Sequence, residues 1–134
     1  MKKRIVVGAT GASGQPLLIK CLEIIRESEK FESYLIMTES ARLTLESETT
    51  WKVEEVEALA DHVLKPEEIG AGPASGSFRT AGMVIVPCSM KTIAGIHSGY
   101  AENLLLRAAD VTIKEQRPLV LAARETPLSP IHLR

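Results

Sequence analysis

The chain has 134 residues, of which 45% are hydrophobic and 25% charged, and sixteen Lys and Arg residues nearly balance seventeen Asp and Glu residues. This length and composition fit one globular domain, and a formal net charge of -1 provides no overall field that would attract nucleic acid or an anionic membrane. No apolar stretch approaches the roughly 20 residues that cross a bilayer, and two cysteines are too few for a disulfide scaffold. We therefore expect a cytoplasmic protein that binds neither nucleic acid nor membrane.

The first half of the chain alternates between predicted strands and helices. Residues 4–8 form an apolar strand that stops at glycines, and Pro16 then stands in the first turn of a helix. Residues 34–37 form a second strand that suits burial on both faces. Helical spacing returns at 41–45 and again at 53–60. This order predicts a βαβ unit.

The second half continues the same alternation. We expect a short strand at 62–64, a loop at 70–77, a central strand at 83–86 ended by Pro87, a helix capped by Ser89 that runs through Gly95, a longer helix at 101–116, and a last strand after Pro118. Such alternation predicts a doubly wound parallel sheet with helices on both faces, a three-layer αβα fold of Rossmann-like or flavodoxin-like type. Ligands of such folds bind outside the carboxyl ends of the strands.

The most specific local motif is GATGASG at residues 8–14, between the first strand and the first helix. Glycines let the backbone approach a phosphate, helix-terminal N–H groups bind it, and Ser13 adds a hydroxyl donor. The spacing is G-x-x-G-x-x-G rather than G-x-G-x-x-G, yet Glu39 follows at about 20 residues, where a ribose-binding acid is expected. The motif predicts a phosphate site, leaves NAD(P) open as the ligand, and also fits a tight turn without a ligand.

A second segment, PCSMKT at residues 87–92, has the same character at the end of another strand. Ser89 and Thr92 are hydroxyl donors, and Lys91 is a cation near a helix start. Two such loops at one edge of a sheet are expected to share a ligand. Cys88 is interpreted as a buried, inert thiol rather than a nucleophile, because no histidine neighbours it in the sequence.

Cations are spread through the last third of the chain. Arg124 follows the last predicted strand and is placed to bind a phosphate at the ligand edge. Arg107 and Lys114 are seven residues apart and share one helix face, where the alternative is a solvated surface. The histidines are scattered, at His62, His97 and His132. Their spacing matches no metal-ligand pattern, so no metal is expected.

Four segments together resemble the flavin prenyltransferase family, whose members were formerly named as aromatic acid decarboxylases. They are GATGASG, LIMTESARLTLESET, SGSFRTAGMVIVPCSMKTIAG and LLLRAADVTIKEQRPLVLAARETPLSPIHLR. The resemblance implies a flavodoxin-like fold and an enzyme that transfers a dimethylallyl group from dimethylallyl phosphate to reduced FMN, without a metal. It further implies a homo-oligomer, either a trimer or a dodecamer. The prenylated FMN would be supplied to a UbiD-type decarboxylase of aromatic or α,β-unsaturated acids.

The resemblance also assigns residues to roles. It implies catalysis by Ser13, Glu48 and Lys114; FMN binding by Gly11, Ala12, Ser13, Thr38, Ser89, Met90, Thr92 and Arg124; and binding of the prenyl phosphate, partly across a subunit interface, by Arg107, Lys114, Arg124 and Glu125. The family pattern continues past Arg134 with a tyrosine and an arginine, so residues 1–134 are expected to form one flavin-binding domain that lacks the family's C-terminal segment. Two alternatives stay open: an NAD(P)-dependent reductase, which the absence of a Tyr-x-x-x-Lys pair disfavours, and a non-catalytic FMN-binding component of an aromatic acid decarboxylase.

Overall fold

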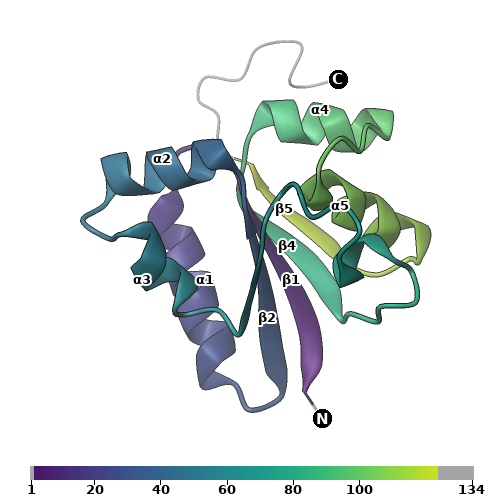
Figure 1. The fold of residues 1–134 in the computed structure, drawn as a ribbon, viewed down its shortest axis with the longest axis horizontal. Helices are drawn as coiled ribbons and strands as arrows, with labels where there is room; N and C mark the ends of the chain where they lie inside the picture. Colours follow the sequence, from purple (N-terminus) through teal and green to yellow (C-terminus); the bar gives the residue numbers. More distant parts are fainter. Residues whose placement is uncertain (1, 124–134) are drawn as a thin grey trace.

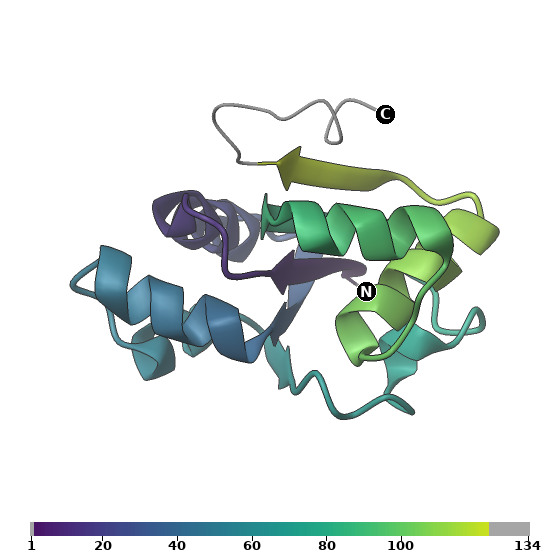
Figure 2. The same ribbon diagram turned by 90° about the horizontal axis from the view of Figure 1, so that it is seen from above.

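The computed structural model describes residues 2–123, which form a parallel sheet between two layers of helices (Figures 1 and 2). The strands are β1 (Lys3–Ala9), β2 (Phe31–Met37), β3 (His62–Leu64), β4 (Gly82–Cys88) and β5 (Leu119–Ala123). The helices are α1 (Gln15–Glu27), α2 (Glu39–Glu48), α3 (Val53–Glu57), α4 (Met90–Ser98) and α5 (Leu104–Lys114), with a short 3-10 turn η1 (Gly72–Ala74). The predicted doubly wound αβα fold is confirmed.

The sheet has the strand order β3-β2-β1-β4-β5, and each neighbouring pair of strands is parallel. Side chains along a strand point alternately to opposite faces. Accordingly, Val7 and Leu35 pack in a core with α1, α2 and α3, whereas Val6, Ile36 and Ile85 pack in a second core with α5. Figure 1 shows α1 and α5 on opposite sides of the sheet. The buried strands explain why their sequences are apolar throughout rather than alternating.

From β1 the chain adds β2 and then β3 towards one edge of the sheet, and it then returns to pair β4 with the other edge of β1. Ligands of open α/β sheets bind where the strand order reverses in this way, outside the carboxyl ends of the strands. Here that place lies between the ends of β1 and β4, and α2 and α4 lie over it at the top of Figure 1. The fold therefore brings the GATGASG and PCSMKT segments to one sheet edge.

Several predicted boundaries differ from those of the structure, and two of the differences have a clear cause. Pro87 does not end its strand, because β4 continues to Cys88; Pro87 has no N–H to donate, and the pairing of β4 with β5 shifts register between Ile85 and Cys88 to accommodate it. The helix expected from residue 101 begins at Leu104, because the side chain of Asn103 caps it by accepting from the backbone N–H of Leu106. Ser129 and Pro130 also have the sequence of a helix cap and first turn, and this prediction lies outside the described residues.

Within residues 2–123, no helix has both the length and the apolar character needed to span a membrane.

Candidate functional site

A cleft of about 110 Å³ opens at the carboxyl ends of the central strands. Its walls come from the loops after β1, β2 and β4 and from the start of α5. The lining residues are Thr10, Gly11, Thr38, Ser40, Ser89, Lys91, Thr92, Glu102, Asn103, Leu105 and Leu106. Both predicted anion-type loops thus contribute to one cavity, and the loop after β2 joins them.

The helices α2 and α4 both begin at this cleft. Thr38 and Ser89 are their N-caps, and each side chain accepts a hydrogen bond from the backbone N–H three residues later, at 3.1 and 3.2 Å. For the N–H groups of residues 39–40 and 90–91, the described part of the chain provides no acceptor. Free amides at two helix N-termini, with Lys91 beside them, make a site suited to a phosphate group.

Thr10 connects the two loops and was not singled out from the sequence. Its side chain is 2% exposed, and its Oγ1 donates to the carbonyl oxygen of Pro87 at 2.9 Å and accepts from the N–H of Ser89 at 2.8 Å. The N–H of Thr10 also donates to the Pro87 carbonyl, at 3.1 Å. One buried hydroxyl therefore fixes the position of Ser89 relative to the GATGASG turn. The available signal was that Thr10 is, with Ser13, one of two hydroxyl residues in a turn otherwise made of glycine and alanine.

Gln15 shapes the same turn from inside. It is fully buried, and its Nε2 donates to the carbonyl oxygens of Thr10 and Ala12 at 2.9 and 3.1 Å. Gly14, the residue before it, has a φ of 114°, a left-handed conformation that favours glycine. The turn is thus held by a side chain that was not singled out from the sequence.

Glu48, at the end of α2, lies against the start of α1. Its carboxylate accepts from the Ser13 hydroxyl at 2.9 Å and from the N–H groups of Gly14 and Gln15 at 3.0 and 2.7 Å. A carboxylate is stabilised by the positive end of a helix dipole. Two of the helix-terminal amides expected to bind phosphate are therefore engaged by Glu48, whereas the amides of residues 39–40 and 90–91 find no acceptor among the described residues. The structure brings together Ser13 and Glu48, two of the predicted catalytic residues.

Gly11 packs directly on α2. A Cβ on Gly11 would lie 2.6 Å from the Cβ of Ser40, and the Thr44 hydroxyl donates to the Gly11 carbonyl oxygen at 3.0 Å. Real Cβ atoms do not approach so closely, so a larger residue would push the turn away from the helix. Glycine is required here by packing on α2, a reason separate from ligand approach.

The predicted phosphate-binding cations are not gathered at the cleft within one chain. Arg107 and Lys114 are exposed on α5 and do not line it, and Lys114 pairs with Asp110 at 3.1 Å. Seven residues of helix place Lys114 about 10 Å further along the axis than Arg107. Arg124 and Glu125 lie outside the described residues. A role for these cations therefore remains a prediction.

Glu39, whose position in the sequence is compatible with an NAD(P) ligand, does not line the cleft. It lines a separate hollow of about 330 Å³ together with Arg42, Lys65 and Glu67. A ribose-binding acid has to face the same ligand as the phosphate-binding turn. The placement of Glu39 therefore argues against the dinucleotide interpretation.

The buried thiol of Cys88 has the inert character expected from the sequence. Burial raises its pKa to about 11, so that the nucleophilic thiolate is scarce at neutral pH. Within the described residues, no group of three or more His, Cys, Asp and Glu side chains is arranged to hold a metal ion.

A cleft suited to a phosphate, at the switch point of a doubly wound parallel sheet, is typical of nucleotide-binding α/β proteins. Comparison with known proteins narrows this class. The sequence profile of the flavoprotein family matches residues 1–133. The chain belongs to the flavoprotein family, and its resemblance to the flavin prenyltransferases is confirmed by the individual relatives.

Among these relatives, a probable UbiX-like flavin prenyltransferase of Streptomyces sp. (strain D7) is 58% identical over 130 residues. The match covers 97% of this chain and 65% of the relative, so the chain spans slightly less than two thirds of that protein. The crystal structure of AnUbiX (PadA1) in complex with FMN and dimethylallyl pyrophosphate is 50% identical, with a TM-score of 0.96, over 99% of this chain and 70% of that chain. A dodecameric FMN-dependent UbiX-like decarboxylase from Escherichia coli O157:H7 is 51% identical, with a TM-score of 0.95, over 97% of this chain and 70% of that chain.

Proposed function

We propose that this chain is a flavin prenyltransferase that transfers a dimethylallyl group from dimethylallyl phosphate to reduced FMN. The observation that carries the proposal is the close match to AnUbiX, whose structure holds FMN together with dimethylallyl pyrophosphate. The switch-point cleft adds an independent physical argument, because its donors suit the phosphate of a mononucleotide.

The residues around the cleft fit the phosphate group of FMN. The amides at the starts of α2 and α4, with the hydroxyl of Thr38 and one of the two mutually bonded hydroxyls of Ser89 and Thr92, supply the donors. Gly11 and Ala12 in the turn, Met90 at the start of α4 and Arg124 complete the proposed FMN-binding set. At about 110 Å³ the cleft is smaller than the roughly 300–1,000 Å³ of whole-ligand pockets. The flavin ring must therefore lie outside it.

Ser13 and Glu48 are proposed to act beside the ring. Reduced FMN, when bound, would supply the nucleophilic atoms N5 and C6. A bond from N5 to the allylic carbon would replace the bond from that carbon to phosphate, with loss of the N5 proton, and a bond from C6 to the far carbon of the prenyl double bond would be balanced by a proton added to the double bond and a proton lost from C6. The carboxylate of Glu48 can accept a proton, and the Ser13 hydroxyl, which donates to it at 2.9 Å, can relay one.

The leaving phosphate needs cations, which Arg107, Lys114 and Arg124 are proposed to supply. Glu125 is proposed to belong to the same substrate-binding set. Lys114 stands too far along α5 to serve the cleft of its own chain, so we infer that a neighbouring protomer contributes it. The dodecameric relative supports a homo-oligomer, either a trimer or a dodecamer. This electrostatic role makes a metal unnecessary.

Anaerobic mixing with reduced FMN and dimethylallyl phosphate tests the proposal. Mass spectrometry of the extracted flavin should show the addition of one prenyl unit, and parallel incubations with dimethylallyl pyrophosphate identify the preferred donor. FMN binding without any prenylation by either donor would favour the non-catalytic flavin-binding component. Equilibrium dialysis that found NADPH bound at micromolar concentration and FMN not bound would favour the reductase instead.

Replacement of Glu48 by glutamine separates its two roles. The side-chain oxygen of the glutamine can still accept from the amides of Gly14 and Gln15, so the α1 start keeps a neutral cap. The loss of the charge should cost about 0.3–1 kcal/mol of stability, while prenyl transfer should fall by a factor of roughly 100 or more. A Glu48→Gln enzyme with full turnover would remove Glu48 from the chemistry and leave it a structural cap.

We further infer that the product, prenylated FMN, passes to a UbiD-type decarboxylase, and that the protein acts in the cytoplasm. The unpaired thiols of Cys21 and Cys88 suit a reducing compartment. Restoration of activity to a purified apo-decarboxylase of this type by the reaction product tests the first inference.

A further inference from the structure

A second, larger hollow lies at the amino ends of β1 and β4, whereas the proposed FMN-phosphate cleft lies at their carboxyl ends. It has a volume of about 660 Å³ and is lined by Lys2, Lys3, Arg4, Ser77, Arg79, Thr80 and Ala81. These residues come from the start of β1 and from the loop that leads into β4. Strand β1 separates Arg4 from Thr10 by about 20 Å, so the hollow is distinct from the site described above.

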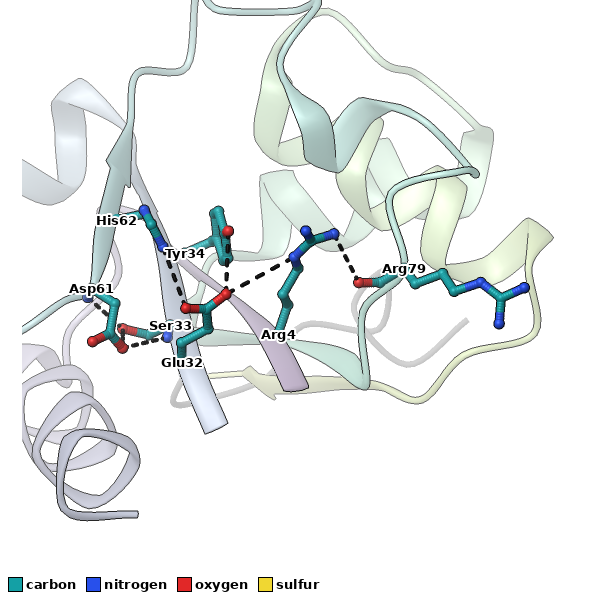
Figure 3. A network of polar contacts seen from close by, with 7 residues as sticks. All are labelled: Arg4, Glu32, Ser33, Tyr34, Asp61, His62 and Arg79. Carbon is teal, nitrogen blue, oxygen red and sulfur yellow. Dashed lines mark hydrogen bonds and ion pairs between the residues drawn. The ribbon is translucent and has the colours of Figure 1, made fainter. Parts of the chain in front are cut away.

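Four cations line this hollow, and none of the carboxylates in residues 2–123 does. Arg4 has an acidic neighbour, Glu32, at 3.9 Å between Nε and Oε1. For the side chains of Lys2, Lys3 and Arg79, the described part of the chain holds no acidic partner within ion-pair distance. Figure 3 shows the guanidinium of Arg79 pointing away from the network around Glu32. In a chain of net charge -1, this is a local concentration of positive charge.

The loop that carries Arg79 is held in place from two sides. The guanidinium of Arg4 lies over the Phe78 ring, 4.0 Å from its centroid, and the backbone carbonyl of Arg4 accepts from the N–H of Ala81 at 2.7 Å. The guanidinium of Arg117 donates to the carbonyl oxygens of Gly76 and Phe78 at 2.8 and 3.2 Å. A hollow with walls fixed in this way loses little conformational freedom when it binds a ligand.

One carboxylate beside the hollow, that of Glu32, is already engaged. Glu32 contacts Arg4, the hydroxyl of Tyr34 at 3.4 Å and Nε2 of His62 at 3.5 Å, and His62 stacks on the Tyr34 ring (Figure 3). In the wall itself, the buried Oγ1 of Thr80 has no hydrogen-bond partner among the described residues. An unsatisfied polar atom beside a cluster of unpaired cations is consistent with a ligand or ion that supplies the missing partner.

We propose that this hollow binds a small molecule through a diphosphate or triphosphate group. Its volume falls within the range of roughly 300–1,000 Å³ that is typical of small-molecule sites. Phosphate oxygens accept charge-assisted hydrogen bonds from Lys and Arg, and several unpaired cations match several phosphates better than one. The adjacent hollow of about 500 Å³ is less suited, because Glu115 lines it and the Arg117 guanidinium is occupied by carbonyl groups.

Amide chemical shifts distinguish this site from the flavin cleft. Titration of the full chain, saturated with FMN, with inorganic pyrophosphate should move the N–H resonances of Ser77, Thr80 and Ala81 and leave those of Ser89 and Thr92 in place. Titrations with ATP and with adenosine tell whether a nucleoside contributes: ATP should bind the same residues, and adenosine should not. Shifts confined to Ser89 and Thr92 would overturn the proposal.

A pair of charge-matched variants completes the test. Arg79→Gln should weaken pyrophosphate binding about tenfold, whereas Lys20→Gln, an exposed cation on α1, should leave it unchanged. Equal weakening in both variants would mean that only overall charge matters, and would refute a defined site. Tighter binding of a poly-glutamate peptide than of pyrophosphate at these amides would also refute it, because the hollow would then be a docking surface for an acidic protein.

Discussion

Replacing Thr10 with valine should remove the side-chain hydrogen bonds that join residues 8–14 to residues 87–92 at the proposed FMN-phosphate cleft. Valine has a similar shape but lacks the hydroxyl that accepts from the Ser89 N–H and donates to the Pro87 carbonyl. The stranded Ser89 N–H costs about 1–3 kcal/mol, and the lost bond to Pro87 about 0.5–1.5 kcal/mol, because that carbonyl keeps the Thr10 N–H as a donor. Together, roughly 2–4 kcal/mol of stability should be lost, and FMN affinity should fall about tenfold as Ser89 shifts.

Denaturant unfolding and calorimetric titration with FMN measure the two effects. Thr112→Val is the matched control, since Thr112 is also buried but its hydroxyl donates to Ala108 within α5, whose carbonyl also has a helical partner. Thr10→Ser should keep the FMN affinity of the wild type, because the hydroxyl is retained. The loss of one methyl group should lower the free energy of unfolding by about 1 kcal/mol. If Thr10→Val matched Thr112→Val in both stability and FMN affinity, the coupling through Thr10 would be refuted.

Three further outcomes are expected. Lys114→Ala should slow prenyl transfer about 10- to 150-fold and leave FMN affinity and stability nearly unchanged, because its exposed pair with Asp110 contributes little; loss of FMN binding in calorimetry would contradict this. Gly11→Ala should destabilise the fold by about 1–3 kcal/mol and weaken FMN binding, since the new Cβ meets Ser40, and a wild-type melting temperature would count against it. Burial raises the pKa of Cys88 from 9.0 to about 11, so the folded state holds this proton more tightly than the unfolded state; the resulting stability is present below pH 9 and is lost as pH rises towards 11, by roughly 2–3 kcal/mol. Unfolding curves across that range should show a smaller slope for Cys88→Ala than for the wild type; part of the slope stays in the variant because burial also raises the pKa of Cys21.

The order of strands and helices was predictable because each carries a strong local pattern. The apolar runs at β1, β2 and β4 are buried on both faces and alternate with segments of helical period, which is typical of a parallel sheet. Boundaries were less predictable where one residue overrides the pattern. Proline usually marks the end of a strand, but at Pro87 an irregular ladder accommodates it. Asn103 shortened the next helix through a side-chain cap that apolar spacing does not reveal.

The candidate site was predictable in its loops but not in its connections. The glycines and hydroxyls of residues 8–14 and 87–92 pointed to one ligand edge, and the structure places both segments on one cleft. The hydrogen bond from Ser89 to Thr10 joins residues 79 positions apart, and such a partner depends on β4 lying beside β1. The engagement of Glu48 with the start of α1 similarly depends on the packing of α2 beside the turn, which no local pattern specifies.

One face of α2 accounts for the shape of the proposed site. Ser40, Thr44 and Glu48 are four residues apart, so they follow one side of the helix, and each meets the GATGASG turn in sequence order. Ser40 packs on Gly11, Thr44 donates to the Gly11 carbonyl, and Glu48 accepts from Ser13 and the amides after it. The ten residues of α2 span about 15 Å, with free amides at the phosphate cleft and the Ser13–Glu48 pair at the other end. Because a single rigid helix sets both ends, the group that binds a phosphate and the group proposed to move a proton keep a constant separation. A mononucleotide held by its phosphate at the first end would extend its base towards the second.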